Sequence, residues 1–134
     1  MNKKALLATL AVFVLTSVLN YVIHGMLLKN AYMQRPELMR PADAAGNYMG
    51  AMWVAFLVFS LAFVWIYQYG VENKPWMGQG IRYGLATWML VSVPRYLIYY
   101  AVEPLEKNVP AMQIGYELPM MVVLGLTVAA LMKK

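Results

Sequence analysis

Four long apolar stretches divide this chain and restrict it to one class of fold. They cover residues 5–28, 48–69, 80–102 and 110–132. Each has the roughly 20 residues that an α-helix needs to cross the hydrocarbon core of a bilayer. With 62% hydrophobic and only 13% charged residues, the chain has too little charge to cover the surface of a soluble domain. We therefore expect an all-α integral membrane protein with a single four-span domain over residues 1–134.

The first stretch has to be compared with a secretory signal peptide, because Lys3 and Lys4 precede it. The hydrophobic core of a signal peptide has only about 7–15 residues, whereas this stretch covers residues 5–28. We therefore expect it to be the first membrane span.

Basic residues are divided unevenly between the two sides of the expected membrane domain. Four spans with short connections predict an up-down-up-down four-helix bundle, in which both termini and the middle loop share one side. The basic residues of that side are Lys3, Lys4, Lys74, Arg82, Lys133 and Lys134. Those of the other side are Lys29, Arg35, Arg40 and Lys107. The positive-inside rule therefore predicts cytoplasmic termini. The net charge of +5 then reflects contact with anionic lipid headgroups, not with nucleic acid.

Two opposite charges lie inside the expected spans. Arg95 is about seven residues from the outer end of the third span, and Glu117 is about seven residues into the fourth, which returns in the opposite direction. At ~1.5 Å of rise per residue, both charges fall roughly 10 Å below the same membrane face. An unpaired charge at this depth costs several kcal/mol, so a matched pair predicts a functional or structural site.

Other polar residues accompany this pair in the outer halves of the spans. In the first span, Thr16, Asn20 and His24 recur at intervals of four and so share one helix face. Pro94 and Pro119 lie close to the two charges, and each removes a backbone hydrogen bond, which predicts kinks that widen the domain there. We expect an outward-opening pocket. Its predicted lining consists of Asn20, His24, Ser92, Arg95, Tyr99, Gln113 and Glu117.

Two interpretations of this polar cluster stay open. In the first, the protein is a non-enzymatic accessory component that associates with itself or with other membrane subunits, and the Arg95–Glu117 pair is a structural clasp. In the second, the pocket binds or transports a small polar or anionic ligand, or protons, with Arg95 holding the anion. Polar residues are scarce in the inner halves of the spans, where Gln68 and two threonines are the candidates. That scarcity argues against a continuous path, so the sequence favours the first interpretation.

No catalytic or cofactor motif is recognisable. The chain has no cysteine and one histidine, which excludes thiolate metal sites and bis-histidine haem ligation within one chain. Twelve methionines leave copper as an alternative, because thioethers bind Cu(I). The candidates around the outer loop lack tight, repeated spacing, so we expect them to pack and not to bind metal. They are Met26, Met33, Met39, Met49 and Met52. We expect no catalytic residue, and the sequence identifies no cofactor.

Glycines at intervals of four predict close contacts between helices. Gly80 and Gly84 lie at the start of the third span, and Gly46 and Gly50 lie at the start of the second. Small residues at this spacing let two helix backbones approach. The contact is either within the chain or between copies of it.

The order of these features along the chain is similar to that in a known class of proteins. The chain has a lysine-bearing start, a first span that ends Asn-Tyr-Val-Ile-His-Gly at residues 20–25, a proline-containing outer loop and a fourth span that ends in Lys133-Lys134. In this order it resembles the small four-span bacterial inner-membrane proteins of unknown function. The resemblance implies a multi-pass protein of the bacterial cytoplasmic membrane and brings no known chemistry.

Overall fold

The structure is a computed structural model that describes residues 2–134. Over these residues it consists of helices and connecting loops, without strands. Four of its helical segments are long and apolar enough to cross a membrane. They are Lys3–Leu27, Pro36–Gly70, Trp76–Val102 and Asn108–Met132. The expectations of an all-α chain and of four segments able to span a membrane are therefore confirmed.

The first segment changes its helical type near its outer end. Helix α1 (Lys3–Asn20) begins where the Asn2 side chain accepts a hydrogen bond from the Ala5 amide at 2.8 Å. It continues as a π-helical turn, η1 (Tyr21–Leu27). Prolines then break the outer loop into single turns, because their rings lack the amide needed to continue a helix. These turns are α2 (Lys29–Met33), η2 (Pro36–Leu38), α3 (Ala42–Ala45) and η3 (Gly46–Tyr48).

The remaining segments are α4 (Met49–Gly70), a composite third segment and α7 (Asn108–Met132). The composite segment joins α5 (Trp76–Thr87), the π-helical turn η4 (Trp88–Ser92) and α6 (Val93–Val102). It begins earlier than expected, because the Gln79 side chain fixes the preceding loop. Its oxygen accepts the Glu72 amide at 2.9 Å, and its nitrogen donates to the carbonyls of Glu72 and Lys74 at 3.0 and 2.8 Å.

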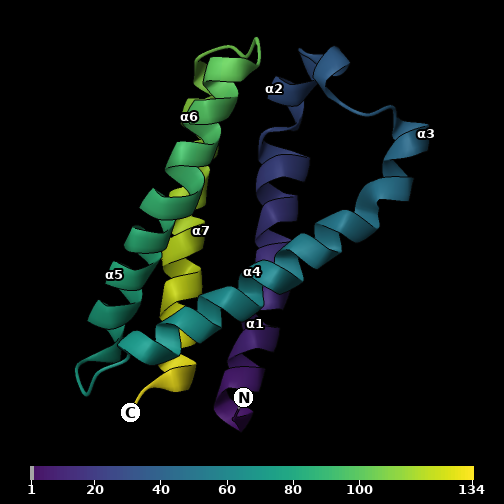
Figure 1. The fold of residues 1–134 in the computed structure, drawn as a ribbon. Helices are drawn as coiled ribbons and strands as arrows, with labels where there is room; N and C mark the ends of the chain where they lie inside the picture. Colours follow the sequence, from purple (N-terminus) through teal and green to yellow (C-terminus); the bar gives the residue numbers. More distant parts are fainter. Residues whose placement is uncertain (1) are drawn as a thin grey trace.

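Helix α7 is the central element of the arrangement. It contacts α1, α4, α5 and α6, and it runs alongside the α5–η4–α6 segment in Figure 1. Helix α4 crosses α1 obliquely and approaches α5 and α7 with its C-terminal part (Figure 1). Both chain termini lie at the same end of the molecule (Figure 1). At that end the Lys134 ammonium donates to the Val71 carbonyl at 3.0 Å.

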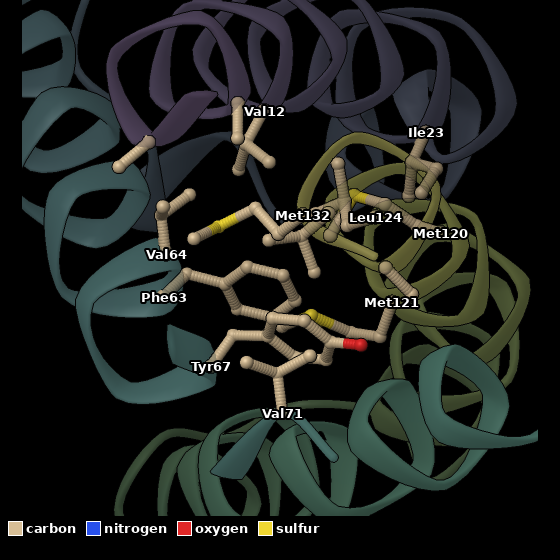
Figure 2. Packing of buried hydrophobic residues seen from close by; sticks show 14 of the residues in the cluster. Val12, Ile23, Phe63, Val64, Tyr67, Val71, Met120, Met121, Leu124 and Met132 are labelled. Atoms are coloured by element: carbon tan, nitrogen blue, oxygen red, sulfur yellow. The ribbon is translucent and has the colours of Figure 1, made fainter. Parts of the chain in front are cut away.

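Most of the apolar core lies toward the end of the molecule that holds the two termini. Figure 2 shows Phe63 and Val64 of α4 pointing toward Val12 of α1 and Leu124 of α7. The buried residues of α4 all come from its C-terminal half, beginning at Ser60. The N-terminal half of α4 therefore diverges from the other helices, and this divergence leaves space beside the polar residues described below.

The contact between α5 and α7 depends on glycine. A Cβ on Gly84 would lie 2.5 Å from the Met121 carbonyl oxygen, and a Cβ on Gly125 would lie 2.2 Å from that of Gly80. The glycine pair of the third segment therefore makes a contact within the chain. In the described part of the chain, a Cβ on Gly46 or Gly50 would meet nothing within 4 Å.

Candidate polar site and cavity

The centre of the site is the carboxylate of Glu117 on α7, which is 0% exposed. Arg95 Nη2 donates to its two oxygens at 2.8 and 2.9 Å. The hydroxyls of Ser92 and Tyr96 also donate to the carboxylate, and His24 Nε2 lies 3.3 Å from its Oε1. Both carboxylate oxygens are therefore satisfied by groups from η1, η4 and α6.

Local backbone structure explains how the third segment supplies three of these partners. Ser92 ends the π-helical turn η4, and Arg95 and Tyr96 follow three and four residues later, so all three side chains face the same neighbour. Pro94 lies in the first turn of α6, directly after η4, and it has no amide to donate to the preceding helical turn. Trp88 Nε1 donates to the Ile114 carbonyl at 2.9 Å and holds η4 against α7. Such π-helical turns occur frequently at functional sites.

A second branch of hydrogen bonds leads from Glu117 toward the outer loop. His24 Nδ1 lies 2.6 Å from the Tyr32 hydroxyl of α2, and Gln113 Nε2 donates to that hydroxyl at 3.0 Å. Burial raises the pKa of the Tyr32 phenol, which keeps a proton available for donation. The hydrogen bonds can then run in one direction. Gln113 donates to the Tyr32 hydroxyl, that hydroxyl donates to His24 Nδ1, and His24 Nε2–H donates to Glu117.

The structure brings some predicted site residues together and separates others. Ser92, Arg95, Glu117 and His24 form the cluster, and Gln113 joins it through Tyr32. Asn20 does not contact the carboxylate, because its amide donates to the Thr16 carbonyl at 2.8 Å. Tyr99 is 46% exposed. Asn20 and Tyr99 therefore belong to the cavity beside the cluster and not to the cluster itself.

Two members of the cluster were missed by the sequence analysis, namely Tyr96 and Tyr32. Tyr96 had a usable signal, because it follows Ser92 by four residues and therefore shares its helix face. Tyr32 had none, because its position depends on the path of the outer loop.

A cavity of about 780 Å³ adjoins the cluster. Helix α4 contributes only apolar side chains to it, whereas α6 contributes Arg95, Tyr96 and Tyr99. The α4 residues are Met49, Met52, Trp53 and Phe56. A smaller cavity of about 130 Å³ reaches Arg95, Glu117 and Asn20 from the direction of the core.

Polar groups at the larger cavity are only partly satisfied. Arg95 donates through Nη2 alone, and within residues 2–134 its Nε and Nη1 have no hydrogen-bond partner. Its side chain is 41% exposed. The Gln113 side-chain oxygen is buried and also lacks a partner among the described residues. The unpaired nitrogens of the partly exposed Arg95 guanidinium are therefore the free hydrogen-bond donors beside this cavity.

Two of the methionines that the sequence offered as copper ligands lie near His24. Residues 2–134 contain no group of three or more His, Cys, Asp or Glu residues that could hold a metal ion. Met33 and Met39 line a further cavity of about 490 Å³ together with His24. Both His24 ring nitrogens already have partners in Tyr32 and Glu117, so a copper ion would have to displace one of them.

Comparisons of the chain with protein-family models, curated proteins and solved structures found no match. The geometry of the polar cluster and of its cavity is therefore what carries the functional interpretation.

Proposed function

We propose that this chain is a non-enzymatic membrane protein that binds a small polar or anionic ligand in the cavity beside Arg95. The observation that carries this proposal is the incomplete hydrogen bonding of the guanidinium. Its Nε and Nη1 lack partners within residues 2–134, although the side chain lies in a membrane-spanning segment and borders about 780 Å³ of open space. Unsatisfied donors are costly in a low-dielectric environment, so a ligand with a hydrogen-bond acceptor has a favourable position there.

The second candidate is the accessory function with the ion pair as a structural clasp. The complete burial of Glu117 favours it, because protein groups from η1, η4 and α6 satisfy the carboxylate without any ligand. In this case the partners are lipid together with further copies of the chain or other membrane subunits. The free donors of Arg95 would then have no role, which is why we place this candidate second.

We also propose that the four spans alternate up and down in a bacterial cytoplasmic membrane, with both termini in the cytoplasm. The support is that Asn2, Lys4, Val71 and Lys134 border one cavity at the same end of the molecule, and that basic residues are enriched there. A periplasm-dependent reporter fused to Lys134 should be inactive, whereas one inserted beside Asp43 should be active. The reverse pattern would place the polar site on the cytoplasmic side.

Ligand binding can be tested with the full chain in nanodiscs of phosphatidylcholine, using tryptophan fluorescence, because Trp53 lines the cavity. The probes are benzamide, which is neutral and polar, and benzoate, which is anionic. We expect at least one of them to give a saturable change. Losing hydrogen bonds to a charged donor costs about 1.5–3 kcal/mol, so the double variant Arg95→Met, Glu117→Met should bind that probe at least about tenfold more weakly.

The double variant removes both charges together and so leaves no unpaired charge in the spans. The matched control is Arg82→Met, which removes an arginine from an exposed position on α5 and should leave the titration unchanged. If neither probe gives a saturable change with the unaltered chain, the binding proposal is wrong and the clasp interpretation is preferred. An equal response of the double variant would also refute a role for Arg95.

A further inference from the structure

The mouth of the larger cavity lies on the side of the molecule, at the depth of the membrane spans. Val18, Tyr21 and Trp53 line the cavity and are 52%, 68% and 47% exposed. All three belong to segments long and apolar enough to span a bilayer. We therefore infer that the cavity opens toward the acyl chains of lipids.

The cavity is also polar on one side and apolar on the other. Arg95, Tyr96 and Gln113 come from α6 and α7, whereas the α4 wall contributes methionine, tryptophan and phenylalanine. A volume of about 780 Å³ is within the ~300–1,000 Å³ of pockets that hold one drug-sized molecule. It fits a headgroup with part of one acyl chain, and it is too small for a complete two-chain phospholipid.

Charge distinguishes between the possible headgroups. Glu117 already neutralises Arg95 at 2.8 Å, so a ligand carboxylate would be a second negative charge in the same low-dielectric region, where like charges repel strongly. A neutral headgroup avoids this cost. The free donors of Arg95 match a neutral carbonyl or hydroxyl oxygen.

Building on the proposed function, we propose that the ligand is a neutral single-chain lipid whose headgroup carries a carbonyl or hydroxyl oxygen as acceptor. It enters the cavity sideways from the bilayer. The headgroup oxygen accepts from Arg95, and the acyl chain lies along the apolar wall of α4. A monoacylglycerol has this chemistry, and a fatty-acid anion of the same chain length has the same apolar part with the unfavourable charge.

The experiment uses the full chain in phosphatidylcholine nanodiscs and a monoacylglycerol brominated on its acyl chain, because bromine quenches tryptophan fluorescence on contact. We expect a saturable component of quenching that Trp53→Phe removes and Trp65→Phe retains. Trp65 is the matched control because it lies on the same helix, is 57% exposed and is outside this cavity. Unlabelled monoacylglycerol should compete at least about tenfold better than oleate, at a pH where oleate is ionised.

The outcomes separate this inference from the proposed function. Equal or better competition by oleate would overturn the charge argument. Binding of benzamide or benzoate without saturable quenching by the brominated lipid would overturn the lipid inference and leave the proposed function in place. If neither small probe binds and the brominated lipid gives no saturable quenching, both the proposed function and the lipid inference are wrong. Saturable quenching that Trp53→Phe does not reduce would show a lipid site elsewhere, which also contradicts the inference. The competition measurements use the unaltered chain, so they do not depend on whether a variant folds.

Discussion

Removing Arg95 and Glu117 separately and together should reveal a strong energetic coupling between them. Glu117 is 0% exposed and Arg95 is its counter-ion. Breaking a buried ion pair by removing one partner costs ~3–5 kcal/mol. For Arg95→Met we expect the lower limit, about 3 kcal/mol, because Ser92, Tyr96 and His24 still contact the carboxylate. For Glu117→Met we expect the upper limit, about 5 kcal/mol, because the same three groups and Arg95 lose their common acceptor.

Independent effects would therefore sum to about 8 kcal/mol in the double variant. Replacing both charges with apolar side chains of similar volume leaves no unpaired charge and is often close to neutral. The remaining cost is that of the donors that lose Glu117, so we expect about 3–5 kcal/mol for the double variant. The coupling free energy, the difference between that sum and the cost of the double variant, is then about 3–5 kcal/mol. In practical terms, the double variant should be no less stable than Glu117→Met alone.

The assay is reversible unfolding of the purified chain in mixed micelles, with the free energy of unfolding measured for all four proteins of the cycle. A matched control cycle uses Arg82→Met in place of Arg95→Met, because Arg82 is exposed on α5. The effect of Arg82→Met on the free energy of unfolding should add to that of Glu117→Met within ~0.5 kcal/mol. Additive destabilisation by Arg95→Met and Glu117→Met would show that the two charges do not interact. The central contact of the proposed site would then be wrong.

Three further predictions concern the packing and the inner loop. Gly84→Ala and Gly125→Ala should each lower the free energy of unfolding by at least about 1–3 kcal/mol, because the added methyl group overpacks α5 against α7. The control is Gly50→Ala, whose Cβ would meet no described atom within 4 Å, and it should be neutral or slightly stabilising in the same assay. Gln79→Ala removes three hydrogen bonds that hold residues 72–74 and should cost about 1–3 kcal/mol, with Gln68→Ala as the near-neutral control. Lys74 lowers the pKa of the Glu72 carboxyl, so their attraction is present above the ordinary pKa of that carboxyl and is lost as the pH falls through the lowered value. An NMR titration of Glu72 should show the low pKa, and Lys74→Met should return it toward its ordinary range; an unchanged pKa would contradict the pairing.

Much of the fold was predictable because it depends on local properties of the chain. The length of each apolar stretch determines whether it can span a bilayer, and the structure has four segments that meet this condition. The rise of an α-helix is nearly constant, so counting residues from the ends of adjacent segments placed Arg95 and Glu117 at one depth, and the structure pairs them at 2.8 Å. Helical periodicity likewise placed Ser92 beside Arg95, and it would have included Tyr96.

The position of α4 could not be predicted in this way. Residues that face lipid and residues that face the core are equally apolar in a membrane protein, so the sequence of α4 gives no signal for the face that packs or for the crossing angle. Its oblique course comes from tertiary contacts of its C-terminal half around Phe63 and Val64. That course creates the cavity, and with it the exposed position of Arg95.

Tyr32 illustrates the same division between sequence and structure. It lies in a single helical turn between prolines and the first segment, where no periodic pattern relates it to the spans. Only the folded path of the outer loop brings its hydroxyl to His24 and Gln113. The sequence alone thus determined the membrane class, the spans and the depth of the charged pair, because these follow from local length and helical rise. The tertiary structure decided which groups complete the site and where it opens, because these depend on contacts between segments that local patterns do not encode.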